Sequence, residues 1–205
     1  MALSKGKKIT IFVILLLVID QVSKILVKTN MTLGQSINVL GDWFQIYFVE
    51  NIGMAFGMSV GGTIGKLLLS IFRIGLATAI FIYIKKLLKK DDVPTGVLFG
   101  LAAIMCGAIG NIIDSLFYGL IFSESGFTQV ATLFPAEGGY AGLFYGKVVD
   151  MLYFPIIDTT LPDWMPIWGG KPFLFFSAIF NFADSCITVG AFYLVIFHWR
   201  FFARK

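Results

Sequence analysis

The sequence predicts an α-helical integral membrane protein with four transmembrane helices and an outer-face lobe that contains a small β element. Of its 205 residues, 58% are hydrophobic and 14% are charged, whereas roughly 25% are charged in soluble domains. The mean hydropathy is +0.86, and four stretches reach the length of about 20 residues that crosses a bilayer. We therefore expect a single membrane domain. The net charge of +4 is small and there is no basic binding module, so we expect no nucleic-acid partner.

The predicted spans cover about residues 9–28, 62–84, 95–120 and 172–199. The first span follows three lysines, as the apolar part of a secretory signal does. No small-x-small cleavage site follows it, however, and the segment continues through Asp20 and Lys24. We expect it to be retained as a helix, on which Asp20 and Lys24 form an ion pair because they are four residues apart.

Basic residues predict how the helices run through the membrane. Ten of the sixteen Lys and Arg residues lie at the N-terminus, after the second span or at the C-terminus: Lys5, Lys7, Lys8, Lys85, Lys86, Lys89, Lys90, Arg200, Arg204 and Lys205. The positive-inside rule therefore places both termini in the cytoplasm. Trp43, Trp164 and Trp168 then lie on the outer side, where aromatic belts form.

Two long segments, about 29–61 and 121–171, connect the spans on the outer side. Residues 43–49 of the first segment alternate partly between polar and apolar side chains, which predicts a strand. A glycine-rich stretch with Gly53 and Gly57 follows. Irregular backbone at membrane depth is tolerated only where it lines a cavity or is buried in protein, so we expect a site that faces outward.

Polar side chains within the most apolar parts of the chain are the strongest functional signal, because ionisable groups at membrane depth are costly and usually face a protected cavity. The pattern Asn-x-x-Asp occurs twice, as Asn111 with Asp114 and as Asn181 with Asp184. At helical spacing each pair presents an amide and a carboxyl on one face. Asp114 lies at the outer end of the third span. We place Asp184 about twelve residues into the fourth span, at an axial depth of roughly 18 Å.

Asp150 lies between the two motifs and adds a third carboxyl. Two carboxyls held together in a low-dielectric site share a proton near neutral pH, because both cannot easily ionise. One then activates a water molecule while the other donates to a carbonyl oxygen, and this aspartyl-type peptide hydrolysis needs no metal. Spacing leaves open which two of Asp114, Asp150 and Asp184 form the pair. Asp150 also fits an ordinary loop carboxylate.

The other reactive side chains fit structural roles. Cys106 and Cys186 lie in apolar stretches without metal-ligand spacing, as small buried residues do. His198 stands at the end of the last span and fits the membrane interface. Ser115 and Ser185 have no histidine nearby in sequence to activate them. We therefore expect no metal site and no cofactor.

Five short blocks follow one another over roughly residues 12–190. They are Asp20-Gln-Val-Ser-Lys24, Asn51-Ile-Gly-Met-Ala-Phe-Gly57, Gly107-Ala-Ile-Gly-Asn-Ile-Ile-Asp114, Val148-Val-Asp150 and Phe180-Asn-Phe-Ala-Asp184. In content and order they resemble the motifs of the type II signal peptidases, the lipoprotein signal peptidases of bacteria. A lone Asn-x-x-Asp is weak evidence, whereas five blocks in order across four predicted spans are specific.

The resemblance implies that Asp150 and Asp184 are the catalytic dyad of an intramembrane aspartyl endopeptidase. It implies that the other motif residues shape or support the pocket: Asn51, Gly53, Asn111, Asp114, Asn181, Asp20 and Lys24. The implied substrate is a prolipoprotein whose cysteine carries diacylglycerol, cut on the amino side of that cysteine. The implied setting is the bacterial cytoplasmic (inner) membrane, with the site near the outer face and membrane lipids around a monomer.

The chain departs from the family pattern in two places. Ser115 stands where the family has an arginine after the third-block aspartate, and Lys147 is a candidate for any basic contact that the arginine provides. The link from Asp114 to Asp150 is also longer than usual. Its extra stretch, about residues 122–146, fits a lid or partner surface as well as it fits a solvated outer loop with interfacial aromatic residues.

Two other classes of protein compete with the peptidase. Membrane carboxylates also form proton relays in transporters and channels, but four spans without an inverted repeat leave little room for alternating access. A membrane scaffold or assembly factor is the third class. Such a protein would tolerate the loss of Asp150 or Asp184, and a peptidase would not.

Overall fold

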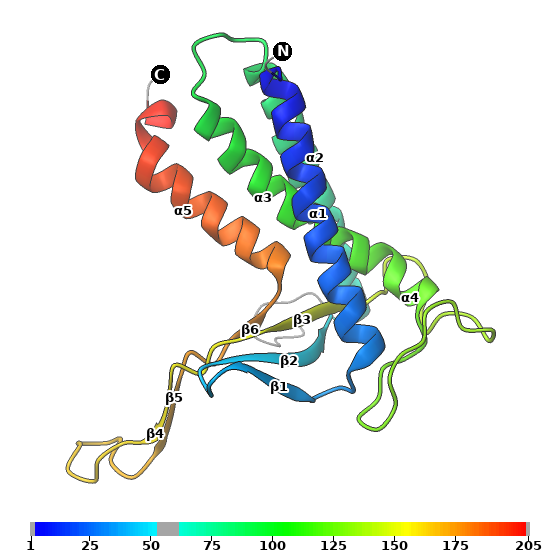
Figure 1. Cartoon of the computed structure of the whole chain (residues 1–205), viewed down its shortest axis with the longest axis vertical. Coiled ribbons are helices and arrows are strands. Elements are labelled where there is room, and N and C mark those ends of the chain that lie inside the picture. Colours follow the sequence, from blue (N-terminus) through cyan, green and yellow to red (C-terminus); the bar gives the residue numbers. More distant parts are fainter. Residues whose placement is uncertain (1–2, 53–61, 204–205) are drawn as a thin grey trace.

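The structure, a computed structural model, describes residues 3–52 and 62–203. In this part of the chain four helices are long and apolar enough to cross a membrane: α1 (Lys5–Asn30), α2 (Gly62–Leu87), α3 (Thr95–Ile113) and α5 (Phe182–Ala203). α3 continues through a π-helical turn, Asp114–Tyr118, into the short α4 (Gly119–Ile121). Both termini and the α2–α3 connection lie at one end of the bundle, and a sheet lies at the other (Figure 1). The protein is an α-helical integral membrane protein, as the composition predicts.

α3 is the central helix of the bundle. In the most apolar 18-residue stretch of α3, 72% is buried inside the protein, whereas the corresponding share is 17% in each of the other three spans. The others therefore present most of their surface to lipid. Small residues let α3 and α5 approach closely, as is common between membrane helices. A Cβ added at Gly190 of α5 would lie 2.9 Å from the carbonyl oxygen of Gly100 on α3, closer than side chains pack.

The sheet lies at the end of the bundle opposite the termini and consists of β1 (Ser36–Leu40), β2 (Phe44–Asn51), β3 (Val148–Tyr153) and β6 (Ile179–Phe180) in that spatial order (Figure 1). All neighbouring strands are antiparallel. The predicted strand at residues 43–49 is β2. β2 and β3 pair so that Asn51 lies opposite Val148 and Val49 opposite Asp150. This register brings two of the five sequence blocks together.

The fourth helix begins ten residues later than predicted. Residues 172–175 form β5 (Pro172–Phe175), which pairs with β4 (Ile157–Thr160), and α5 starts only at Phe182. The prediction of a span from 172 was wrong because hydropathy alone cannot distinguish an apolar strand from a helix. β4 and β5 form an arm that projects from the sheet, away from the helices, toward the lower left of Figure 1.

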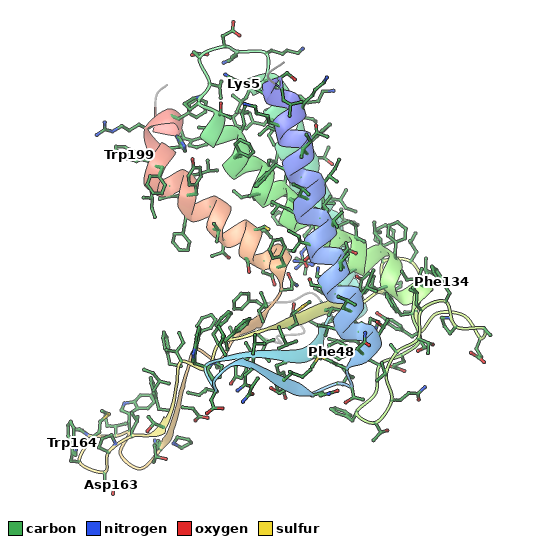
Figure 2. All side chains as sticks on the ribbon, in the orientation of Figure 1. Lys5, Phe48, Phe134, Asp163, Trp164 and Trp199 are labelled. Atoms are coloured by element: carbon green, nitrogen blue, oxygen red, sulfur yellow. The ribbon has the colours of Figure 1, made fainter. Side chains whose placement is uncertain are left out.

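The long link at residues 122–146 is irregular but anchored on its inner side. Phe122 is fully buried beside Tyr118, and the Gly146 amide donates to the Ser115 carbonyl at 3.0 Å. From α2, the buried Lys66 donates to the carbonyl of Tyr145 at 2.7 Å. The outer side of the link is exposed and places Phe134 at one extreme of the molecule (Figure 2). The link thus packs against the sheet-side ends of α2 and α3.

Candidate active site

Asp150 is buried on β3, at the boundary between the sheet and the helices. Its Oδ1 accepts a hydrogen bond from the Asn181 side-chain amide at 2.7 Å, and its Oδ2 accepts one from the Asn51 amide at 3.1 Å. The two donors come from opposite sides of β3 in the sheet, one next to α5 and the other on β2. Their bonds fix the plane of the carboxyl, so Asp150 is no ordinary loop carboxylate.

Asp184 lies in the first turn of α5, and this corrects the depth expected for it. Asn181 caps the helix. Its side-chain Oδ1 accepts a hydrogen bond from the backbone N–H of Asp184 at 2.9 Å, and Asp184 Oδ2 accepts one from the backbone N–H of Asn181 at 3.4 Å. Such a reciprocal pair is a capping box. Asn181 therefore stands before the helix and not on its face. The cap holds the half-buried Asp184 carboxyl at the sheet end of the bundle.

Asn111 of α3 joins the two sides of the site. Its side-chain amide donates to Asp184 Oδ1 at 2.8 Å, and its Oδ1 accepts from Asn181 at 3.1 Å. Asn181 is therefore bonded at once to Asp150, to Asp184 and to Asn111. The two Asn-x-x-Asp motifs and Asp150 form one network, in which the side chains of Asn111 and Asn181 bridge Asp150 and Asp184.

Asp114 belongs to a neighbouring ion cluster centred on Lys24. The buried Lys24 ammonium contacts Asp20 at 3.0 Å, Asp114 at 2.8 Å and the Asn111 side-chain oxygen at 3.0 Å, which uses all three of its protons. The predicted Asp20–Lys24 pair is present. Asp20 accepts from the Ala183 amide at 2.9 Å, and Asp114 accepts from the Val149 amide at 3.4 Å. The cluster thus ties α1 and α3 to the residues just before Asp184 and Asp150.

Two glycines of the third block are required by close packing. A Cβ at Gly107 would overlap the carbonyl oxygen of Ala183, and one at Gly110 would lie 2.5 Å from Asp20 Oδ2. Bulkier residues would therefore push α5 and α1 away from α3. Gly53, another predicted pocket residue, lies outside the described residues.

The environment of Asp150 favours its protonated form. Burial and the nearby Asp184 carboxylate raise the pKa of Asp150 to about 7, and the bonds from Asn51 and Asn181 oppose this shift. One carboxyl of the pair therefore carries a proton for part of the time at neutral pH. Such an arrangement provides an acid and a base in one site.

Arg73 is a site residue that the sequence reasoning missed. It lies on the stripe of α2 formed by Lys66, Ser70, Arg73 and Ala77, where the other three side chains are buried. Ala77 packs against Ala108 and Ile112 of α3, one turn from Asn111. The Arg73 guanidinium lies close enough to Asp184, Asp150 and Asp114 to interact with them electrostatically. A lone arginine within an apolar helix was the available signal.

Lys147 does not take the position of the missing family arginine. Its ammonium contacts Glu50 at 3.2 Å and Glu124 at 3.3 Å. Glu50 is also paired with Lys28 and accepts from Ser125 at 2.7 Å. Lys147 thus helps to fasten the 122–146 link to α1 and β2. Glu50, the focus of this second cluster, precedes Asn51 directly.

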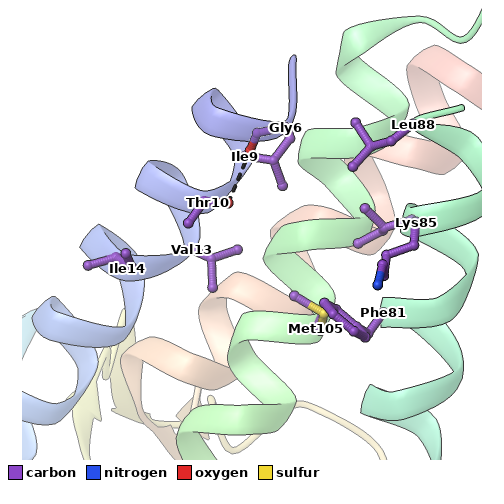
Figure 3. Close-up of a pocket in the computed structure, with 10 residues that line it drawn as sticks. Gly6, Ile9, Thr10, Val13, Ile14, Phe81, Lys85, Leu88 and Met105 are labelled. Atoms are coloured by element: carbon purple, nitrogen blue, oxygen red, sulfur yellow. Dashed lines mark hydrogen bonds between the residues drawn. The ribbon is translucent and has the colours of Figure 1, made fainter. Parts of the chain in front are cut away.

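An apolar cavity of about 340 Å³ lies elsewhere, at the terminal end of the bundle (Figure 3). Ile9 and Val13 of α1, Phe81 of α2 and Met105 of α3 contribute to its wall. It contains none of the residues predicted for the site, and its surface is almost entirely apolar. Cys106 and Cys186 are buried and unbridged, as expected of structural residues.

The sequence matches one protein family over nearly its whole length. The family described as Signal peptidase (SPase) II matches residues 12–200. A lipoprotein signal peptidase from Porphyromonas gingivalis is 52% identical over 199 residues, which cover 97% of this chain and 85% of that protein. Two others bear the same name. The one from Amoebophilus asiaticus is 40% identical over 89% of this chain and 74% of its own. The one from Chlorobium phaeobacteroides is 30% identical over 93% of this chain and 94% of its own.

Solved structures share the fold. A bacterial membrane enzyme determined by the in meso method at 2.3 Å resolution superposes with a TM-score of 0.60 at 21% identity, covering 97% of this chain and 92% of that one. A second such structure, at 1.9 Å resolution, superposes with a TM-score of 0.58 and covers 93% of this chain and 91% of that one. The motifs expected of the family, the family match and the identity to these relatives agree. This chain belongs to the signal peptidase II family of membrane peptidases.

Proposed function

We propose that this protein is an intramembrane aspartic endopeptidase that removes signal peptides from diacylglyceryl-modified prolipoproteins. Family membership supports the reaction class, and the name lipoprotein signal peptidase carried by its relatives supports the substrate class. The observation on which the mechanism rests is the network in which Asn181 bonds to both Asp150 and Asp184. The family resemblance implies that the bond cut is the one on the amino side of the lipidated cysteine.

In the proposed mechanism Asp150 begins protonated and Asp184 begins ionised. Burial and the neighbouring carboxylate raise the pKa of Asp150 to about 7 and so favour its protonated form. Asp184 takes a proton from a water molecule as the water oxygen attacks the scissile carbonyl carbon. Asp150 donates its proton to the carbonyl oxygen. When the tetrahedral intermediate collapses, the C–N bond breaks and the leaving nitrogen receives the proton held by Asp184. One hydroxyl proton of the intermediate returns to Asp150, and the new carboxyl group stays with the signal peptide.

The surrounding residues hold the dyad in position. Asn51 and Asn181 orient the Asp150 carboxyl, and Asn111 orients that of Asp184. The cluster of Asp20, Lys24 and Asp114 positions the dyad indirectly. Asp20 accepts a hydrogen bond from the Ala183 backbone amide, next to Asp184, and Asp114 accepts one from the Val149 backbone amide, next to Asp150. Gly53 remains a predicted pocket residue.

We assign to Arg73 the basic contact that the family arginine provides elsewhere. Ser115 occupies that arginine's position and donates to the Asn111 carbonyl at 3.0 Å. Arg73 interacts from α2 with the same three carboxylates and balances part of their charge. A guanidinium there stabilises negative charge near the reacting carbonyl oxygen.

The proposed orientation places both termini in the cytoplasm and the dyad near the outer membrane boundary. Both termini and the lysine-rich α2–α3 connection lie at the same end of the bundle (Figure 1). This grouping of basic residues supports the positive-inside argument. A signal helix that reaches the dyad from the side then has its lipidated cysteine near the lipid headgroups. No partner subunit is required in this scheme, which treats the chain as a monomer.

The test is to incubate the purified protein with a diacylglyceryl-modified precursor and, separately, with the same precursor lacking the lipid. We expect cleavage of the lipidated form alone, with a new N-terminus at the modified cysteine found by mass spectrometry. Cleavage of neither form by a folded protein would contradict the peptidase assignment and favour a scaffold. Equal cleavage of both would contradict the proposed substrate class.

A further inference from the structure

The arm formed by residues 155–176 is not used by the proposed reaction. It consists of β4, β5 and the loop between them, and its two strands pair only with each other. The arm leaves the sheet after β3, which ends at Tyr153, and returns just before β6 and the start of α5. In Figure 1 it runs down and to the left from the sheet, on the same side of the molecule as α5.

The strand register gives the arm one apolar face. Ile157 lies opposite Phe175, and Thr159 lies opposite Phe173. Directly opposite residues, and residues two apart on a strand, point to the same side of a sheet. Ile157, Phe173 and Phe175 therefore share a face, and all three are exposed, at 45%, 39% and 50%. The other face is mixed: Asp158 lies opposite Leu174, which is 41% exposed, and Thr160 lies opposite Pro172.

The tip of the arm continues this apolar character. Trp164 is 79% exposed, Ile167 83% and Trp168 58%. The Lys171 ammonium lies over the Trp168 ring at 5.6 Å, which is an amphipathic pairing. Figure 2 shows Asp163 at the lower edge of the tip and Trp164 above it, nearer the level of the helices. Large apolar side chains so exposed to water on one short hairpin indicate a surface that contacts another phase or partner.

We propose that this arm lies in the outer lipid–water interface of the membrane beside α5. The chain passes from the arm into α5 within six residues, and α5 also exposes large apolar side chains: Val189, Phe192 and Ile196 are each at least 62% exposed. Tryptophan beside lysine is typical of the headgroup level, where the ring is solvated at one edge and apolar at the other. The proposal rests on the membrane embedding of the four helices and is independent of the peptidase reaction.

Bound in this way, the arm would set the height of the bundle in the bilayer. β5 is separated from α5 by only six residues, 176–181, and Asp184 lies in the first turn of α5. Anchoring the arm at the interface therefore fixes the depth of that turn.

Tryptophan fluorescence in lipid nanodiscs tests the placement. Trp43→Phe, Trp168→Phe and Trp199→Phe together leave Trp164 as the reporter, since the chain has four tryptophans. A matched variant adds Trp164→Phe and Asp163→Trp, which moves the reporter by one residue to the polar edge. We expect phosphatidylcholine brominated on its acyl chains to reduce Trp164 emission by about twofold or more, and the matched reporter less.

Two results would overturn the proposal. One is Trp164 emission that aqueous iodide quenches and brominated lipid does not. The other is Trp164 emission that brominated lipid leaves unchanged but that shifts when the prolipoprotein is added, because this would assign the arm to the substrate polypeptide.

Discussion

The side-chain amide of Asn181 donates to the carboxyl of Asp150 at 2.7 Å. Asn181 also caps α5 and exchanges backbone and side-chain hydrogen bonds with Asp184. One residue thus sets where the last helix begins and how far its first carboxyl lies from the carboxyl on β3. The same residue, Asn181, therefore caps α5 and bonds to both carboxyls of the candidate catalytic dyad.

A pair of substitutions separates these two roles of Asn181. Serine is a good cap but has no amide to reach Asp150, whereas alanine provides neither group. We expect Asn181→Ser and Asn181→Ala to reduce the cleavage rate to a similar extent. Only Asn181→Ala should also lose about 1 kcal/mol of stability through the cap. Cleavage assays and denaturant unfolding in detergent measure the two effects. A normal cleavage rate in Asn181→Ser would show that the amide bond to Asp150 is dispensable.

The pH dependence of cleavage should report the proton on Asp150. With its pKa raised to about 7, Asp150 loses the required proton as the pH rises through that value, so kcat/KM should fall on the alkaline side. Asn51 donates to the charged form at 3.1 Å and lowers the pKa. Asn51→Ala should therefore raise the pKa and move the alkaline limb to higher pH. A limb that stays in place, or moves to lower pH, would contradict the assignment of Asp150 as the acid.

Lys24 should dominate the stability of the helix contacts at this end of the bundle. Its side chain and those of Asp20 and Asp114 are at most 2% exposed. Removing one partner of a buried ion cluster leaves uncompensated charge and costs about 3–5 kcal/mol, so Lys24→Met should be strongly destabilised. Adding Asp114→Asn to Lys24→Met should recover part of the loss. The exposed Lys8→Met serves as the control. A free energy of unfolding for Lys24→Met that lies within about 0.5 kcal/mol of the value for the unsubstituted protein would refute this view of the cluster.

Arg73 should contribute to cleavage through its charge. Arg73→Gln removes the cation that interacts with Asp184 and Asp150, and we expect a fall of about tenfold or more in kcat. Arg73→Lys keeps the charge and should retain more activity. Lys86→Gln, an exposed change at the other end of α2, controls for the loss of a basic residue on this helix. The charge assignment fails if Arg73→Gln cleaves at the normal rate.

Hydropathy predicted the helices well but misplaced the start of the last one. Residues 172–180 are nearly as apolar as the helix itself, so composition does not reveal that they form strands. The correct boundary was available in the local chemistry. An Asn with an Asp three residues later, just before an apolar run, is a sign of a helix N-terminus. Treating Asn181 and Asp184 as two positions on one helical face concealed that sign.

The sequence motifs name the candidate site residues, but they do not predict the contacts between them. The motifs identified Asp150, Asn51 and Asn111, yet Asn51 and Asp150 meet across 99 residues of sequence through the β2–β3 register. Such pairing depends on long-range packing that no local pattern encodes. Arg73 was missed because it belongs to none of the five blocks. Its position inside an apolar helix was the cue.

The central claim is that Asp150 and Asp184 act together on one water molecule. The most direct measurement compares cleavage of the lipidated precursor by Asp150→Asn and Asp184→Asn, with Asp158→Asn on the arm as the control. We expect each dyad variant to insert and fold normally but to lose about 10²-fold or more in kcat, while the control keeps its activity. Normal processing of the precursor by either dyad variant would contradict the mechanism.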